Sequence, residues 1–245
     1  MKIKRIWTVC LVLVVLGMLV SLRPEGLASK EEDRGPLTKV TFIHFKKSQV
    51  RGGGASKPKP SPVSSCYGFL ASGAKWKTVE PYLINPNNFS GLSQEFIVES
   101  MEKGVGEWEK YGGNIFGEVG AGISAVYGIY DDQNAVQFGV LDDPNVIAVT
   151  TVWGYFYGAP KTRELVEWDM LFNEGSDWTW GDAKVDPALM DLQNIATHEL
   201  GHSAGMDDLY ETSCMAETMY GYSSEGEVSK RDLNAGDITG IQKLY

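Results

Sequence analysis

The sequence predicts an α+β fold, in which one domain of strands and helices follows a short N-terminal export segment and a linker. Three observations support this prediction. A helix pattern opens the domain, several short β-like runs separated by Gly- and Asp-rich turns follow it, and two further helix patterns close it. The 245 residues are enough for one domain of good size, and a hydrophobic content of 43% can supply its core.

The N-terminus has the order of a secretory signal peptide. Basic residues precede an apolar run at residues 6–20, and small residues follow at 26–28. We therefore interpret residues 1–28 as a signal peptide. The run is shorter than the roughly 20 residues of a membrane span, and an uncleaved N-terminal anchor is the alternative. The expected location is extracellular, with membrane contact only if this segment stays attached.

Residues 29–65 are assigned to a basic linker, and the folded domain to residues 66–245. The part from 46 to 65 is rich in Gly and Pro, contains several Lys and has almost no large apolar side chains. Just before it, residues 39–45 alternate weakly like a strand. His44 lies in that short segment, and we expect it to be a surface residue and not a metal ligand.

The domain is strongly acidic. Residues 64–245 carry ten basic and twenty-eight acidic side chains, a balance that argues against nucleic acid as a partner and favours solubility as a monomer. Acidic pairs could also offer carboxylates to calcium, and the candidates are Asp131-Asp132 and Asp142-Asp143. Paired acids in turns are usually only turn residues, so calcium is a secondary expectation beside zinc.

The first helix is predicted from Ser93, as N-cap, to about residue 111. Its apolar face would consist of Ile97, Met101, Val105 and Trp108. Strands are predicted at residues 76–84, 125–130, 135–140, 146–153 and 165–172. A second helix is predicted from the Asp186 cap and Pro187 through Gly201 to about residue 204, and a third at 235–244.

The residues that carry chemistry lie in His198-Glu-Leu-Gly-His202 and the six residues after it. On a helix, positions four apart project from one face, so His198 and His202 can bind one ion. Gly205 comes where the helix must end, because glycine tolerates the left-handed backbone that turns the chain back. Asp208 can then supply a third ligand. Ordinary helix histidines are the structural alternative, but only three His exist in the whole chain.

Three protein ligands with a fourth position left for water are typical of a catalytic zinc site. Glu199 follows the first ligand directly, so its carboxylate can reach the metal-bound water without binding the metal. We therefore expect Glu199 to act as the general base, taking a proton from the water and passing it to the leaving amine.

At these residues the sequence resembles the metzincin metallopeptidases, and most closely their matrixin branch. Residues 198–208, HELGHSAGMDD, match the long family motif, with Asp208 in the place of the usual third His. Other metzincins share this variant. Glu217-Thr-Met219-Tyr220-Gly221 resembles the Met-turn, and residues 236–245 resemble the closing helix. Upstream, residues 146–153 resemble the edge strand along which substrate lies, and 167–173 the next inner strand. The resemblance implies a zincin fold with a twisted mixed sheet and three helices.

The resemblance covers roughly residues 66–245 and has departures. The structural zinc of matrixins needs further histidines that this domain lacks, and no PRCG-like latency sequence is present. Met219 would pack beneath the metal. Tyr220 and Tyr222 would either line the specificity pocket or simply pack.

Cysteine usage suggests one disulfide. Cys10 would leave with the signal peptide, and export to an oxidising compartment then favours a bond between Cys66 and Cys214. Two independent buried thiols are the alternative. A latency thiolate at Cys66 is a further one, and we do not expect it.

The sequence thus predicts a secreted zinc endopeptidase that hydrolyses proteins or peptides. The alternative from another class is a cell-surface binding or scaffold module that keeps the metzincin fold without catalysis. An intact Glu199 counts against this alternative, because a binding module has no use for a general base.

Overall fold

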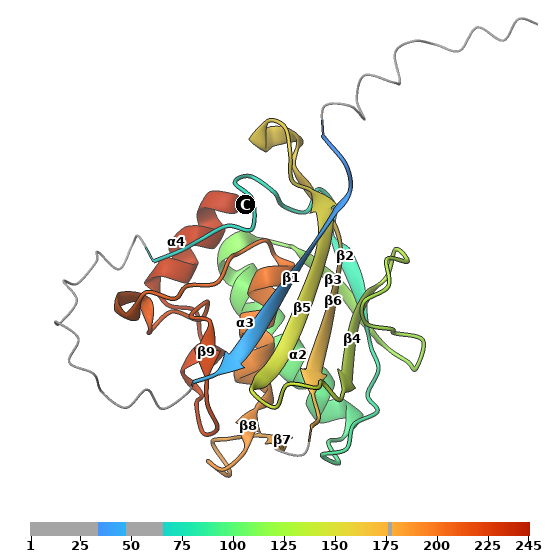
Figure 1. Cartoon of the computed structure of the whole chain (residues 1–245), viewed down its shortest axis with the longest axis vertical. Coiled ribbons are helices and arrows are strands. Elements are labelled where there is room, and N and C mark those ends of the chain that lie inside the picture. The colour runs from blue at the N-terminus through green and yellow to red at the C-terminus, as the bar shows by residue number, and fades with distance from the viewer. Residues whose placement is uncertain (1–33, 48–65, 176–177) are drawn as a thin grey trace, which may run out of the picture.

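The computed structural model describes residues 34–47, 66–175 and 178–245 (Figure 1). A seven-stranded mixed sheet and three α-helices in these ranges confirm the predicted α+β class. The strands are β1 (Thr38–Lys46), β2 (Glu80–Ile84), β3 (Phe116–Ala121), β4 (Asn134–Gly139), β5 (Val146–Tyr155), β6 (Glu164–Asn173), β7 (Trp180–Gly181), β8 (Met190–Asp191) and β9 (Tyr222–Ser223). The helices are α2 (Gln94–Gly112), α3 (Leu192–Ser203) and α4 (Ala235–Leu244).

The strand order in the large sheet is β3-β2-β4-β6-β5-β1-β9. The neighbours β3, β2, β4 and β6 run parallel, β5 runs antiparallel to β6, and β1 runs antiparallel to β5 and parallel to β9. Strands β5 and β6 are buried along almost their whole length. The mostly apolar sequence of β5 is that expected of a central strand covered on both faces, whereas β6 also buries the carboxylates of Glu167 and Asp169.

The helices pack behind the sheet and position the site (Figure 1). Ser93 caps α2 by accepting a hydrogen bond from the backbone N–H of Phe96, as predicted. Helices α2 and α3 approach closely at Gly104, where a Cβ would lie 2.8 Å from Cδ1 of Leu200. The indole N–H of Trp108 then donates to the carbonyl of Thr197 at 2.7 Å, which joins the two helices inside the core.

Helix α3 begins later than the sequence predicts. Asp186 caps only a local turn, by accepting from the N–H of Ala188 at 3.0 Å. The N-cap of the helix is Asp191, which accepts from Asn194 N at 2.8 Å. The guanidinium of Arg231 also donates to Asp191, from Nε at 2.8 Å. This buried ion pair fixes the helix start.

Two strand predictions need correction. The first strand is confined to β2, and the run at 125–130 is a loop. The loop is attached through buried carboxylates of β6, because Gly128 N–H donates to Asp169 and the N–H groups at 131 and 132 donate to Glu167. Strand β3 was not predicted at all, since its sequence FGEVGA has three small residues and little alternation.

The largest correction concerns the linker. Residues 38–46 were assigned to it, but they form β1, a strand of the large sheet, so a domain boundary at residue 66 excludes part of the fold. The predicted signal peptide at 1–28 lies outside the described residues. None of the described helices is long and apolar enough to cross a membrane. The disulfide between Cys66 and Cys214 is present, with Cα atoms 5.4 Å apart.

Candidate active site

Helix α3 carries His198, Glu199 and His202 into the centre of the domain. Their side chains are buried, with exposed fractions of 0%, 0% and 1%. The two imidazoles lie on one helix face with ring centroids 4.9 Å apart. The four-residue spacing therefore gives the convergence that the sequence predicts.

The chain leaves α3 through Gly205 and returns to the histidines. Gly205 has a φ of +100°, a backbone conformation that L side chains rarely adopt. The N–H of Met206 donates to the carbonyl of Gly201 at 2.9 Å and closes the helix end. This turn brings Oδ1 of Asp208 to 3.3 Å from Nε2 of His198 and 3.5 Å from Nε2 of His202.

The tautomers of both histidines follow from their second nitrogens. Nδ1 of His198 lies 2.7 Å from the carbonyl oxygen of Thr218, and Nδ1 of His202 lies 3.1 Å from that of Met206. A carbonyl can only accept, so each Nδ1 carries a proton, and in the neutral form of each ring Nε2 presents a lone pair. Burial and the nearby Lys230 lower the pKa of His198 to about 4, which keeps this imidazole neutral.

The three converging atoms fit a cation. Burial alone would raise the pKa of Asp208, but the two histidines hold it well below its ordinary value, so the carboxylate is ionised. Oδ1 of Asp208 and Nε2 of His198 are buried without a hydrogen-bond partner among the described residues. One atom from each of the three side chains lies within 4.8 Å of the others. Two imidazole nitrogens and a carboxylate oxygen are a donor set that zinc accepts.

Glu199 lies beside the three converging atoms, with a carboxylate oxygen within 4.8 Å of a ring nitrogen of His198. Its Oε2 accepts from the hydroxyl of Thr150 at 2.6 Å, and its Oε1 lies 3.1 Å from Nδ1 of His44. Burial raises the pKa of Glu199 to about 7. A buried carboxyl with such a pKa can both take up and release a proton near neutral pH.

Met219 packs against α3 at Gly201, next to His202. A Cβ at Gly201 would meet its sulfur, so helix and methionine touch where a glycine leaves space. The carboxylate of Asp237, in the first turn of α4, accepts from the N–H groups of Thr218 and Met219 at 2.6 and 3.1 Å. This buried network holds the turn against the site.

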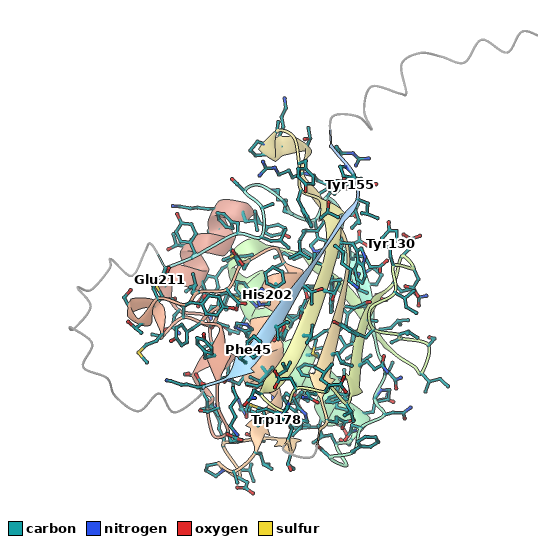
Figure 2. All side chains as sticks on the ribbon, viewed as in Figure 1. Phe45, Tyr130, Tyr155, Trp178, His202 and Glu211 are labelled. Carbon is teal, nitrogen blue, oxygen red and sulfur yellow. A yellow bond between two sulfur atoms is a disulfide. The ribbon has the colours of Figure 1, made fainter. Side chains whose placement is uncertain are left out.

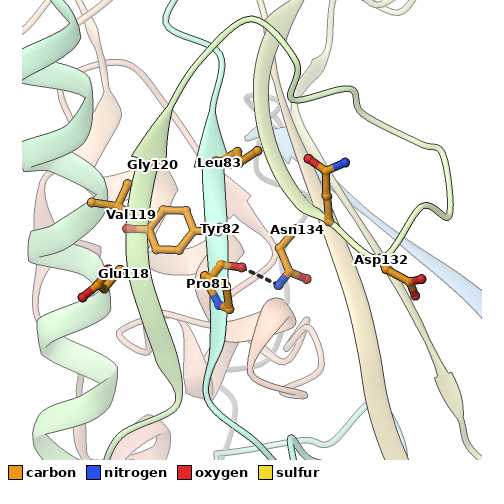
Figure 3. A pocket seen from close by; sticks show the side chains of 9 residues that line it. Pro81, Tyr82, Leu83, Glu118, Val119, Gly120, Asp132 and Asn134 are labelled. Carbon is orange, nitrogen blue, oxygen red and sulfur yellow. Dashed lines mark hydrogen bonds between the residues drawn. The ribbon is translucent and has the colours of Figure 1, made fainter.

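The acidic pairs proposed for calcium do not form a metal cluster. In the described part of the chain, the groups of three or more metal-ligating side chains involve only His44, His198, Glu199, His202 and Asp208. A depression of about 380 Å³ lies elsewhere in the sheet, over β2, β3 and the start of β4 (Figure 3). Asn134 and the carbonyl of Pro81 are hydrogen bonded there. Asp132, one of the acidic residues considered for calcium, lines the depression, but His198, Glu199, His202 and Asp208 do not.

Four further residues lie near the site, and the sequence motifs either do not indicate them or place them elsewhere. Tyr210 donates its hydroxyl to Oδ2 of Asp208 at 3.0 Å and so orients the carboxylate. His44 was expected at the surface and is instead buried against Glu199. Phe42 stacks on His202 with ring centroids 3.9 Å apart (His202 is labelled beside β1 in Figure 2). Lys230 is buried next to His44, with Nζ 3.3 Å from its Nε2.

Of the two tyrosines considered for a specificity pocket, Tyr220 is buried and Tyr222 is half-buried. Their carbonyl oxygens both accept from Nζ of Lys230, the second at 2.9 Å. Their rings lie 5.7 Å apart. The backbone of this segment thus takes part in the surroundings of His44, while a role of the rings in specificity stays a prediction.

Comparison with known proteins adds the family. The family model described as Matrixin matches residues 76–245. Stromelysin-1 of Mus musculus is 28% identical over 172 residues, which are 70% of this chain and 33% of that protein. The hatching enzyme of Paracentrotus lividus is 26% identical over 178 residues, 72% of this chain and 27% of that protein. Human (Homo sapiens) matrilysin is 36% identical over 77 residues, 31% of this chain and 26% of that protein. These matches span a third or less of each relative.

Proposed function

The chain belongs to the matrixin family, whose members are metallopeptidases, and from this membership and the site we propose that it is a secreted zinc endopeptidase. We assign His198, His202 and Asp208 as the zinc ligands and Glu199 as the general base. Proteins or peptides would be the substrates.

The observation that supports this proposal most directly is the set of unpaired acceptors. Nε2 of His198 and Oδ1 of Asp208 are buried and have no hydrogen-bond partner among the described residues, and Nε2 of His202 faces the same point. Leaving buried polar atoms unpaired costs about 1–3 kcal/mol each. A bound cation would remove this cost, so the arrangement is understandable as a metal site.

When bound, zinc would polarise the scissile carbonyl and lower the pKa of water towards neutrality. Glu199 would then accept a proton from the attacking water, whose oxygen forms the new bond to the carbonyl carbon. The same carboxyl would give the proton to the nitrogen as the carbon–nitrogen bond breaks. The hydroxyl of Thr150 would hold the carboxylate in place from Oε2 during both transfers.

A Glu199→Gln variant tests the assignment. The amide cannot accept the proton, so peptide turnover should fall by about 10²–10⁴-fold, while elemental analysis should still find one zinc per chain. Glu167→Gln is the matched control, because it is the same change at a buried carboxylate on β6, outside the site. A chelator should abolish the wild-type activity.

Normal turnover without Glu199 would refute the mechanism. Zinc binding by the wild-type chain without any turnover, in full-length protein and in the β1 variants described below, would favour the binding-module alternative.

A further inference from the structure

Strand β1 covers the catalytic residues. A peptidase that cuts across an open cleft must let a peptide bond reach its general base, but Glu199 and His198 have exposed fractions of 0%. The side chains that close the site come from residues ahead of the Cys66 boundary. Phe42 stacks on the ring of His202, and the ring centroids of His44 and His198 lie 3.9 Å apart.

The strand lies as an extended peptide would. It pairs antiparallel with β5 from Thr38 to Phe45 and parallel with β9 at Phe45 and Lys46, so both of its edges are hydrogen bonded (Figure 1). Addition of a strand to a sheet edge is a common way of binding extended peptides. Alternate side chains face the site, since Phe42 and His44 are buried while Ile43 is 38% exposed.

His44 is in direct contact with Glu199, the proposed general base. Nζ of Lys230 is a donor only and lies 3.3 Å from Nε2 of His44, so Nδ1 carries the proton and donates to Oε1 of Glu199 at 3.1 Å. Thr150 donates to the other carboxylate oxygen at 2.6 Å. Both oxygens of Glu199 therefore have partners that are not water.

We propose that β1 is an internal blocking strand that holds the enzyme latent, with His44 engaging Glu199 and Phe42 covering His202. Substrate reaches the site only after residues 38–46 have left it. The contact acts on the general base and needs no cysteine, and Cys66 is in any case bound to Cys214. The proposal deepens the function proposed above and rests on it.

The test uses the full-length chain loaded with zinc. The double variant Phe42→Ala/His44→Ala removes the two inward side chains, and Ile43→Ala is the matched control on the outward face of the same strand. The first probe is a peptide hydroxamate, whose affinity for the zinc site is measured by calorimetry. The second probe is a fluorescent peptide with the sequence of residues 38–46, followed by anisotropy. Turnover of a peptide substrate is measured in parallel.

The double variant should bind both probes at least about tenfold more tightly than the wild-type chain, because apparent affinity scales with the fraction of open molecules. The Ile43→Ala chain should behave as wild type. A synthetic peptide with both alanines should fail to compete with the hydroxamate in the double variant, whereas the unaltered peptide should compete.

Equal affinity of wild type and double variant for both probes would overturn the proposal, as would an equal gain in the Ile43→Ala control. If the double variant does not fold, the single change His44→Ala is tested with the same probes. Tighter probe binding without peptide turnover in any chain would uphold the blocking strand and refute the peptidase function, so the two failures are distinguishable.

Discussion

Removal of the disulfide should cost the domain a large part of its stability. The bond joins cysteines 148 residues apart, and the chain-entropy relation gives about 5 kcal/mol for a loop of that length. Strain and residual structure in the unfolded chain lower this figure, so we expect a loss of about 2–5 kcal/mol in Cys66→Ser/Cys214→Ser. For a domain of this size, each kcal/mol lowers the melting temperature by about 2–4 °C.

Urea and thermal unfolding, with and without reductant, measure this loss. Reductant should shift the wild-type transition towards that of the double variant and leave the variant unchanged. Zinc content at low temperature should survive reduction, since neither cysteine is a ligand. A variant that unfolds within about 0.5 kcal/mol of wild type, the range typical of neutral surface substitutions, would refute the estimate. Two free thiols in the unfolded, unreduced protein would show that the bond does not form.

Three further outcomes are expected. Asp208→Asn should weaken zinc binding by more than about a hundredfold, which exceeds the loss typical of changes to residues that only contact a ligand. Asp207→Asn is the control and should leave zinc binding unchanged. Equal effects at the two positions would show that the ligand is misassigned. Gly201→Ala should destabilise the protein by about 1–3 kcal/mol, because the new Cβ would meet the sulfur of Met219. Gly106→Ala has open space at its Cβ and should not destabilise it. The midpoints of urea unfolding measure both effects. Burial raises the pKa of Glu167 to about 7 from its ordinary 4.5. The folded protein therefore holds this proton more tightly than the unfolded chain, and the folded state loses stability as pH rises between these two values. Glu167→Gln should therefore be more stable than wild type at about pH 8 and equal to it at about pH 4, and a difference independent of pH would contradict this sign.

The parts of the fold that sequence could predict are those with local causes. Helix α2 has a serine N-cap and one apolar face within twenty residues, and α4 has an asparagine N-cap and inward apolar residues. The sequence therefore predicts the bounds of both helices to within a residue or two. The start of α3 could not be predicted. Asp186-Pro187 is a good local signal for a helix start, but the N-cap of α3 is Asp191. Asp191 is held by Arg231, which lies 40 positions further along the chain.

The candidate site divides in the same way. The motif from His198 to Asp208 is contiguous, and its spacing together with the turn at Gly205 brings the three acceptor atoms together. His44 lies 155 positions from Glu199, its hydrogen-bond partner. The alternation of residues 39–45 indicated a strand, but nothing in it indicated which edge that strand would join. A Gly- and Pro-rich stretch directly after it favoured a linker assignment.

The disulfide also determines how β1 is attached to the rest of the molecule. Lys47 and Cys66 are joined by residues 48–65, and Cys66 is bonded to Cys214 near the site. While this connection is continuous, β1 competes with substrate as an intramolecular ligand, and short connections of this kind give effective concentrations on the order of millimolar. One cut between Lys47 and Cys66 would turn β1 into a separate peptide that dilutes away. The disulfide would keep the new N-terminus in place.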